Sequence, residues 1–161
     1  MSALSFQFRL HSRHGGPKSI APCPNPGGPS SESIGVEVLG PEGIWQPLQP
    51  SLTTPGFRLF LLSLLLCQHH YLVANAMELA IPLAEVNGRF EVSAAENWII
   101  EAVQGDFQLG LAPQACGLQG LVDPAQLTFL EQRMALCPVS RNLPATVQKR
   151  ITVTLDQQQS S

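Results

Sequence analysis

The stretch that decides the fold, residues 55–79, reads PGFRLFLLSLLLCQHHYLVANAMEL. It contains no Gly or Pro after Gly56, and Leu, Ala and Met dominate, so it favours a helix, with Thr54 as N-cap and Pro55 in the first turn. Before Cys67 the apolar residues lie on nearly every side, which is typical of a helix buried all round. After Cys67 the pattern predicts an amphipathic helix with apolar Tyr71, Leu72, Ala74 and Met77 and polar Gln68, His69, Asn75 and Glu78.

Alternating apolar residues predict strands on both sides of this helix. The predicted strands cover residues 4–10, 34–38, 44–45, 86–92, 98–111 and 147–155, with bends at 96–97 and 105–106. A second helix is expected to begin at Asp123, because Asp, Pro124 and Gln126 match a capping box, and to end at Cys137 before Pro138. The order predicts one α+β domain over residues 1–161, with antiparallel sheets.

Composition limits the function. Charged residues make up 13% of the 161 residues against a typical ~25%, which predicts a surface partly covered by a second copy of the chain. The net charge is −3 and no basic patch occurs, so nucleic-acid binding is not expected. The apolar run before Gln68 is shorter than the ~20 residues of a membrane span, and residues 1–13 do not resemble a signal peptide. We therefore expect a cytoplasmic protein with reduced cysteines and no membrane partner.

Two segments are expected to be irregular. Residues 14–33 are rich in Gly, Pro and Ser and predict a flexible loop that contains Cys23, whose thiol is most simply incidental. The tail from about residue 157 is expected to be disordered. Cys116 lies in a second loop flanked by glycines, and its role stays open.

The other two cysteines lie in more informative places. Cys137 precedes a segment that can begin a short helix with Pro138 at its first position, and the positive end of a helix favours the thiolate. Arg141 lies one turn further on. Cys67 lies in an apolar helix, where burial raises the pKa of a thiol, so it is either an inert core residue or the floor of a reactive site. Cys67, His70 and Cys137 could instead bind zinc, but no metal or other cofactor is expected.

Two phrases resemble the OsmC/Ohr family, the osmotically inducible and organic hydroperoxide resistance proteins. Residues 136–143, LCPVSRNL, resemble the second-cysteine motif of that family. Residues 77–83, MELAIPL, resemble the phrase that ends its central helix, and Cys67 occupies the place of its first cysteine. The resemblance runs from about residue 55 to 155.

The resemblance implies an intertwined homodimer, with the central helices packed together and the strands of both chains in two sheets. It implies a peroxiredoxin-like peroxidase of oxidative stress and detoxification, in which Cys67 reduces an organic hydroperoxide. Cys67 then becomes a sulfenic acid, Cys137 resolves it as a disulfide, and a thiol reductant restores both thiols.

The sequence also departs from the family pattern. Active members carry a glutamate near the start of the central helix, paired with an arginine, where this chain has Pro55-Gly56-Phe57-Arg58. Residues 64–66 are leucines where the family has small residues. Arg9 and Arg58 are candidate replacements for the missing cation, beside Arg141. Two functions stay open: an organic hydroperoxide reductase, and a catalytically impaired homodimer that binds a small apolar ligand or has a structural role.

Overall fold

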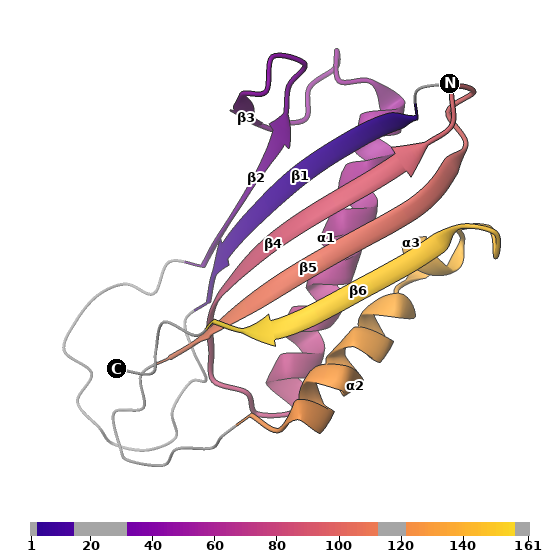
Figure 1. Cartoon of the computed structure of the whole chain (residues 1–161). Coiled ribbons are helices and arrows are strands. Elements are labelled where there is room, and N and C mark those ends of the chain that lie inside the picture. Colours follow the sequence, from indigo (N-terminus) through magenta and orange to yellow (C-terminus); the bar gives the residue numbers. More distant parts are fainter. Residues whose placement is uncertain (1–2, 15–31, 113–121, 157–161) are drawn as a thin grey trace.

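The computed structural model describes residues 3–14, 32–112 and 122–156. Cys23, Cys116, the predicted tail and most of the predicted loop at 14–33 lie outside these residues. The elements are β1 (Leu4–Arg13), β2 (Ser33–Leu39), β3 (Trp45–Pro47), α1 (Gly56–Glu78), β4 (Leu83–Ala94), β5 (Ile100–Leu111), α2 (Pro124–Ala135), α3 (Pro138–Arg141) and β6 (Gln148–Leu155). Figure 1 shows α1 behind the middle strands and α2 alongside it, nearer β6.

The six strands form one sheet in the order β3-β2-β1-β4-β5-β6. Neighbouring strands pair antiparallel except β5 and β6, which are parallel. The prediction of purely antiparallel pairing is therefore wrong for β6. The reason lies in the connection, because α2 and α3 separate these strands in the chain. The helical connection carries the chain from the end of β5 back to the edge of the sheet at which β5 began, so β6 runs in the same direction.

The start of α1 differs from the prediction. Pro55 is the N-cap residue and makes no side-chain cap, whereas Thr54 lies outside the helix. The hydroxyl of Thr54 accepts a hydrogen bond from the backbone N–H of Ser51 at 2.9 Å, so it stabilises the preceding turn instead. The helix itself is confirmed over nearly the whole predicted range.

The two sides of α1 are not those predicted. One side packs on the sheet and α2, and it includes Gln68, His69 and Asn75, which were predicted to lie on the polar side. The other side leaves large apolar residues accessible, among them Leu59 (37% exposed), Phe60 (39%), Leu66 (36%) and Met77 (72%). Within this single chain the helix is thus buried on one side, and the prediction of a helix buried all round is wrong.

The helix is also longer than its apolar run. By length and composition alone α1 is able to cross a membrane, with a mean hydropathy of 1.3 over its most apolar window. Length therefore does not argue against a span, contrary to the reasoning from the sequence. The core helix of a folded domain passes the same test, and Leu61, Leu65 and Leu72 on this helix are fully buried in the hydrophobic core.

The predicted bend at Gly105 is wrong, because Gly105 lies within the continuous strand β5. A Cβ atom at this position would lie 2.8 Å from Cε2 of Phe107 and 3.2 Å from Oε1 of Gln68. The glycine therefore leaves room for the Phe107 ring and for α1 to approach the sheet. The predicted turn at residues 96–97 is confirmed between β4 and β5.

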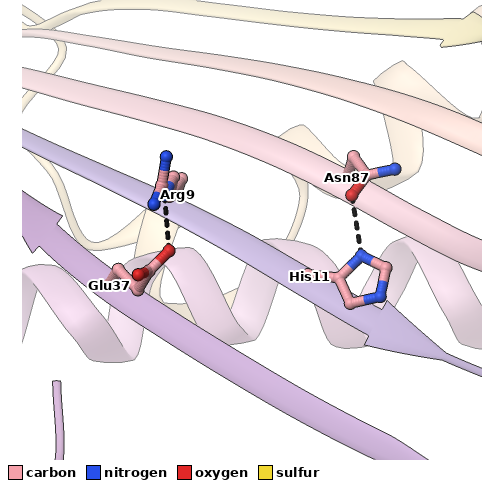
Figure 2. Close-up of polar contacts among 4 residues, drawn as sticks. All are labelled: Arg9, His11, Glu37 and Asn87. Carbon is pink, nitrogen blue, oxygen red and sulfur yellow. Dashed lines mark hydrogen bonds and ion pairs between the residues drawn. The ribbon is translucent and has the colours of Figure 1, made fainter. Parts of the chain in front are cut away.

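The face of the sheet opposite α1 is polar (Figure 2). Arg9 forms an ion pair with Glu37 across β1 and β2, and its guanidinium lies 4.7 Å from the ring centroid of Trp45. His11 Nδ1 lies 2.7 Å from Oδ1 of Asn87 on β4. In Figure 2 these side chains lie in front of the strands, whereas α1 runs behind them. The core lies between the other face and the helices.

Candidate functional site

The capping box stabilises the start of α2, the helix that leads the chain back to α1. The Asp123 carboxylate accepts from the N–H of Ala125 at 2.8 Å, and the Gln126 side chain accepts from the N–H of Asp123 at 2.9 Å. Both bonds were predicted and are confirmed. Near the other end of α2, Arg133 Nε donates to Oδ1 of Asn75 on α1 at 3.0 Å. This hydrogen bond joins α1 and α2 near the end of α2, shortly before α3 begins.

Cys137 sits between α2 and α3 as the N-cap residue of α3. The second helix ends before it, at Ala135, and the short helix predicted from Pro138 is confirmed. The Cys137 side chain is fully buried, and its Sγ accepts a hydrogen bond from the backbone N–H of Ser140 at 3.4 Å. Helix α1 packs against α3, and Cys67 on α1 lies close enough to Cys137 to shift the pKa of its thiol. Two thiols that are far apart in the sequence therefore meet at one place.

The thiolate of Cys137 is not favoured in the reduced protein, contrary to the prediction. The pKa of the Cys137 thiol is raised to about 11, chiefly by burial and to a smaller extent by the neighbouring Cys67. The backbone N–H groups of Ser140 and Val139 lower it, but less strongly. A single-turn helix supplies a weak dipole, so loss of water at a fully buried sulfur decides the outcome.

The three predicted arginines do not converge on the thiols. Arg9 is paired with Glu37 on the polar face of the sheet. Arg58 lies in the first turn of α1, roughly 13 Å along the helix axis from Cys67. Arg141 is exposed at the end of α3. No Arg or Lys of the described residues is among the groups that shift the pKa of Cys137.

The zinc alternative finds no support in the geometry. Within residues 3–14, 32–112 and 122–156, no three His, Cys, Asp or Glu side chains are grouped so that they could hold a metal ion. His70 is exposed, and its ring contacts that of Tyr71 at a centroid distance of 6.3 Å.

A second polar cluster lies on the sheet-facing side of α1, and the sequence analysis missed it. His69 Nε2 and His14 Nε2 each lie 2.8 Å from the hydroxyl oxygen of Ser12, and the two rings stack at 5.8 Å. The alternation of β1 could have revealed it, because Ser12 follows Phe8 and Leu10 on the inward face. The pKa of His69 is lowered to about 4, chiefly by burial and to a smaller extent by the nearby His14 and His70.

We expect this cluster to make the protein sensitive to acid. An unfolded chain binds a proton on His69 below pH ~6.5, whereas the folded protein binds it near pH 4. Stability is therefore unaffected above pH ~6.5 and is lost as the pH falls from there toward 4, by roughly 3 kcal/mol in total. Urea unfolding at several pH values measures this loss.

The substitution His69→Gln is expected to remove most of this pH dependence while keeping a polar side chain at the position. His11→Gln is the matched control, because His11 lies on the polar face of the sheet, is not among the groups that shift the pKa of His69, and should leave the dependence unchanged. Equal pH dependence in the two variants would contradict the assignment.

Comparison with known proteins supports the resemblance at the level of the fold. No family model matches the chain, and no curated protein matches its sequence. Among solved structures, the fold is similar to that of a protein from Psychrobacter arcticus 273-4 described as an osmotic stress induced and detoxification response protein. The TM-score is 0.50 at 12% identity, over 74% of this chain and 87% of that one. The likeness shows a shared mixed α+β fold with a single sheet and few helices, consistent with the OsmC-like arrangement.

Proposed function

We propose that this protein is a thiol-dependent peroxidase that reduces organic hydroperoxides through Cys67 and Cys137. The observation that carries the proposal is the contact between these two thiols, one on α1 and one at the start of α3. Two adjacent thiols suit a cycle in which one is oxidised and the other resolves it as a disulfide. The similar fold of a protein described as a stress and detoxification protein adds support.

The exposure of the two cysteines supports the roles that we propose for them. Cys67 is half-buried and therefore reachable by a substrate, whereas Cys137 is fully buried. Cys67 attacks the peroxide, so that its thiol and ROOH give a sulfenic acid and ROH. The thiol of Cys137 then condenses with the sulfenic acid, and the disulfide forms with release of water. Two equivalents of a thiol reductant regenerate both cysteines.

The apolar surface beside Cys67 favours an organic peroxide over hydrogen peroxide. Leu59, Phe60 and Leu66 are partly exposed on the same helix. No Lys, Arg, Asp or Glu occurs from Leu59 to Met77. The alkyl or aryl group of a substrate can therefore approach the thiol without removing water from a charged side chain. A substrate with an apolar tail is therefore preferred.

A homodimer is part of the proposal. Exposed or half-buried positions of α1 recur in alternating steps of four and three residues, which is the spacing of a coiled-coil seam. This α1 stripe consists of Leu59, Ser63, Leu66, His70, Val73 and Met77. A second copy of α1 packed on the stripe removes its apolar side chains from water and also covers the approach to Cys67.

One observation favours the alternative, a catalytically impaired homodimer that binds a small apolar ligand or has a structural role. The start of α1 carries Gly56, Phe57 and Arg58 in place of the family's glutamate, and burial holds Cys137 in its thiol form. Both candidates share the fold and the stripe and differ in whether Cys67 reacts. We place either protein in the cytoplasm, where its thiols stay reduced.

Peptide mapping after oxidation tests the proposal. The reduced protein receives one equivalent of an organic hydroperoxide, and its peptides are analysed by mass spectrometry without reductant. We expect a rapid disulfide between Cys67 and Cys137, faster than with hydrogen peroxide. Two unmodified thiols would contradict the peroxidase and leave the ligand-binding alternative.

A further inference from the structure

The hydroxyl of Ser140 is buried without a hydrogen bond. Its side chain is 1% exposed, and Oγ has no partner among the residues that the structure describes. A buried hydroxyl without a partner costs free energy, because its bonds to water are lost and not replaced. Such a group in a folded protein calls for an explanation, and a catalytic role is one of those to consider.

The surroundings of this hydroxyl indicate its role. Ser140 follows Cys137 by three residues, and its backbone N–H already donates to the Cys137 sulfur. Cys67 on α1, which packs against α3, lies close enough to shift the pKa of the Cys137 thiol. Lys149 on β6 donates from Nζ to the Ser140 carbonyl oxygen at 2.9 Å and fixes the turn, whereas Arg141 is exposed.

We propose that the Ser140 hydroxyl donates a hydrogen bond to the Cys137 sulfur as that sulfur becomes a thiolate, and so enables Cys137 to attack Cys67. In the reduced protein the hydroxyl makes no bond to the Cys137 sulfur, which accepts the backbone N–H of Ser140 instead. The proposed bond therefore forms when the Ser140 side chain turns toward the sulfur, which a neutral thiol, as a weak acceptor, does not favour. A thiolate is a stronger, charged acceptor, and a bond to the charged form lowers the pKa of the thiol. The part that Ser140 plays in turnover rests on the proposed function, but its effect on the thiolate does not.

The step balances without a further reactant. The S–H bond of Cys137 breaks, and a sulfur–sulfur bond forms to Cys67 while the sulfur–oxygen bond of its sulfenic acid breaks. The departing hydroxide and the proton of Cys137 form water. Burial disfavours the thiolate of Cys137. Each hydrogen bond donated to the Cys137 sulfur therefore raises the thiolate population and the rate of this step.

An aromatic disulfide tests the inference without peroxide. In a background with Cys23→Ser and Cys116→Ser, a chromogenic aryl disulfide reacts with Cys67 and releases one coloured thiol. Attack by Cys137 on this mixed disulfide then releases the second. The second phase therefore measures the reactivity of Cys137 alone.

We expect Ser140→Ala to slow the second phase about threefold and to leave the first unchanged. Loss of one bond raises the thiol pKa by about one unit, so the thiolate is about tenfold scarcer but about threefold more nucleophilic. The urea midpoint should stay equal or rise, because a hydroxyl without a partner is removed. Arg141→Ala, in the same short helix, is the matched control and should change neither phase.

Each outcome has a distinct meaning. A second phase unchanged in Ser140→Ala overturns the inference. A slowed second phase with a lowered urea midpoint also overturns it, because the hydroxyl is then structural. If the wild type completes both phases but forms no disulfide with a hydroperoxide, the proposed function fails and the role of Ser140 stands.

Discussion

Replacing Cys67 by serine is expected to lower the consumption of organic hydroperoxide to the rate of buffer alone. Serine keeps the size and the hydrogen-bonding capacity of the side chain, but its hydroxyl is not ionised near neutral pH and is a poor nucleophile toward a peroxide. The half-buried position of Cys67 accepts this change without a large cavity. A coupled assay with a dithiol reductant measures the loss.

The matching change in Cys137 should have a different result. Cys137→Ser leaves Cys67 able to react, so about one equivalent of peroxide per chain is consumed in a burst. In the absence of the reductant the reaction then stops at the sulfenic acid, because no second thiol of the site resolves it. A sulfenic-acid reagent should label Cys67 in this variant and not in the wild type.

The loop cysteines provide the controls. Cys23→Ser and Cys116→Ser should each retain the full rate, since neither lies among the residues of the proposed site. Unchanged turnover in Cys67→Ser would refute the assignment of the peroxidatic thiol. A burst that is absent from Cys137→Ser would show that the two cysteines do not act in the proposed order.

Local signals were enough to predict the elements that carry their own capping residues. The Asp123, Pro124 and Gln126 pattern located α2, and Pro138 located α3, because these residues satisfy backbone groups within a single turn. Helix α1 followed from its uninterrupted apolar composition. These predictions needed no knowledge of distant contacts.

The orientation of α1 could not be read from the same information. Gln68 and His69 are polar, yet they face the sheet. Gly105 leaves room for the Gln68 side chain, and the Ser12 hydroxyl is a hydrogen-bond partner for His69. Leu66 and Met77 are apolar, yet they are exposed in one chain. Periodicity assumes that each chain buries its own apolar residues, and that assumption fails where a partner covers a face.

The proximity of the two cysteines was predicted, the raised pKa of Cys137 was not, and their catalytic roles stay predictions. The resemblance paired Cys67 with Cys137, and the structure brings their side chains together. Burial depends on how the whole chain packs. The raised pKa of Cys137 could therefore not be predicted from the neighbouring residues in the sequence. The same holds for Arg9, whose partner Glu37 lies on another strand 28 residues further along the chain.

Substituting Leu66 by glutamate is expected to convert a dimer into a monomer. Leu66 lies in the middle of the α1 stripe and is 36% exposed in the single chain, so the glutamate is tolerated when the chain is alone. In a symmetric dimer the same position occurs twice, and two carboxylates are removed from water against an apolar surface. A cost of roughly 4 kcal/mol in total corresponds to about a thousandfold weaker association.

Sedimentation velocity over a range of concentrations measures this effect, with urea unfolding to show that the variant is folded. Ile44→Glu is the matched control, because Ile44 is a 57% exposed apolar residue in the turn between β2 and β3, away from α1. It should leave the dimer intact. A wild-type chain that sediments as a monomer, or a Leu66→Glu variant that remains dimeric, would remove the α1 stripe as the interface. No charged side chain occurs from Leu59 to Met77, which is about five turns of helix. Exposure of such an apolar face to water is unfavourable, so a different partner would then be required to cover it.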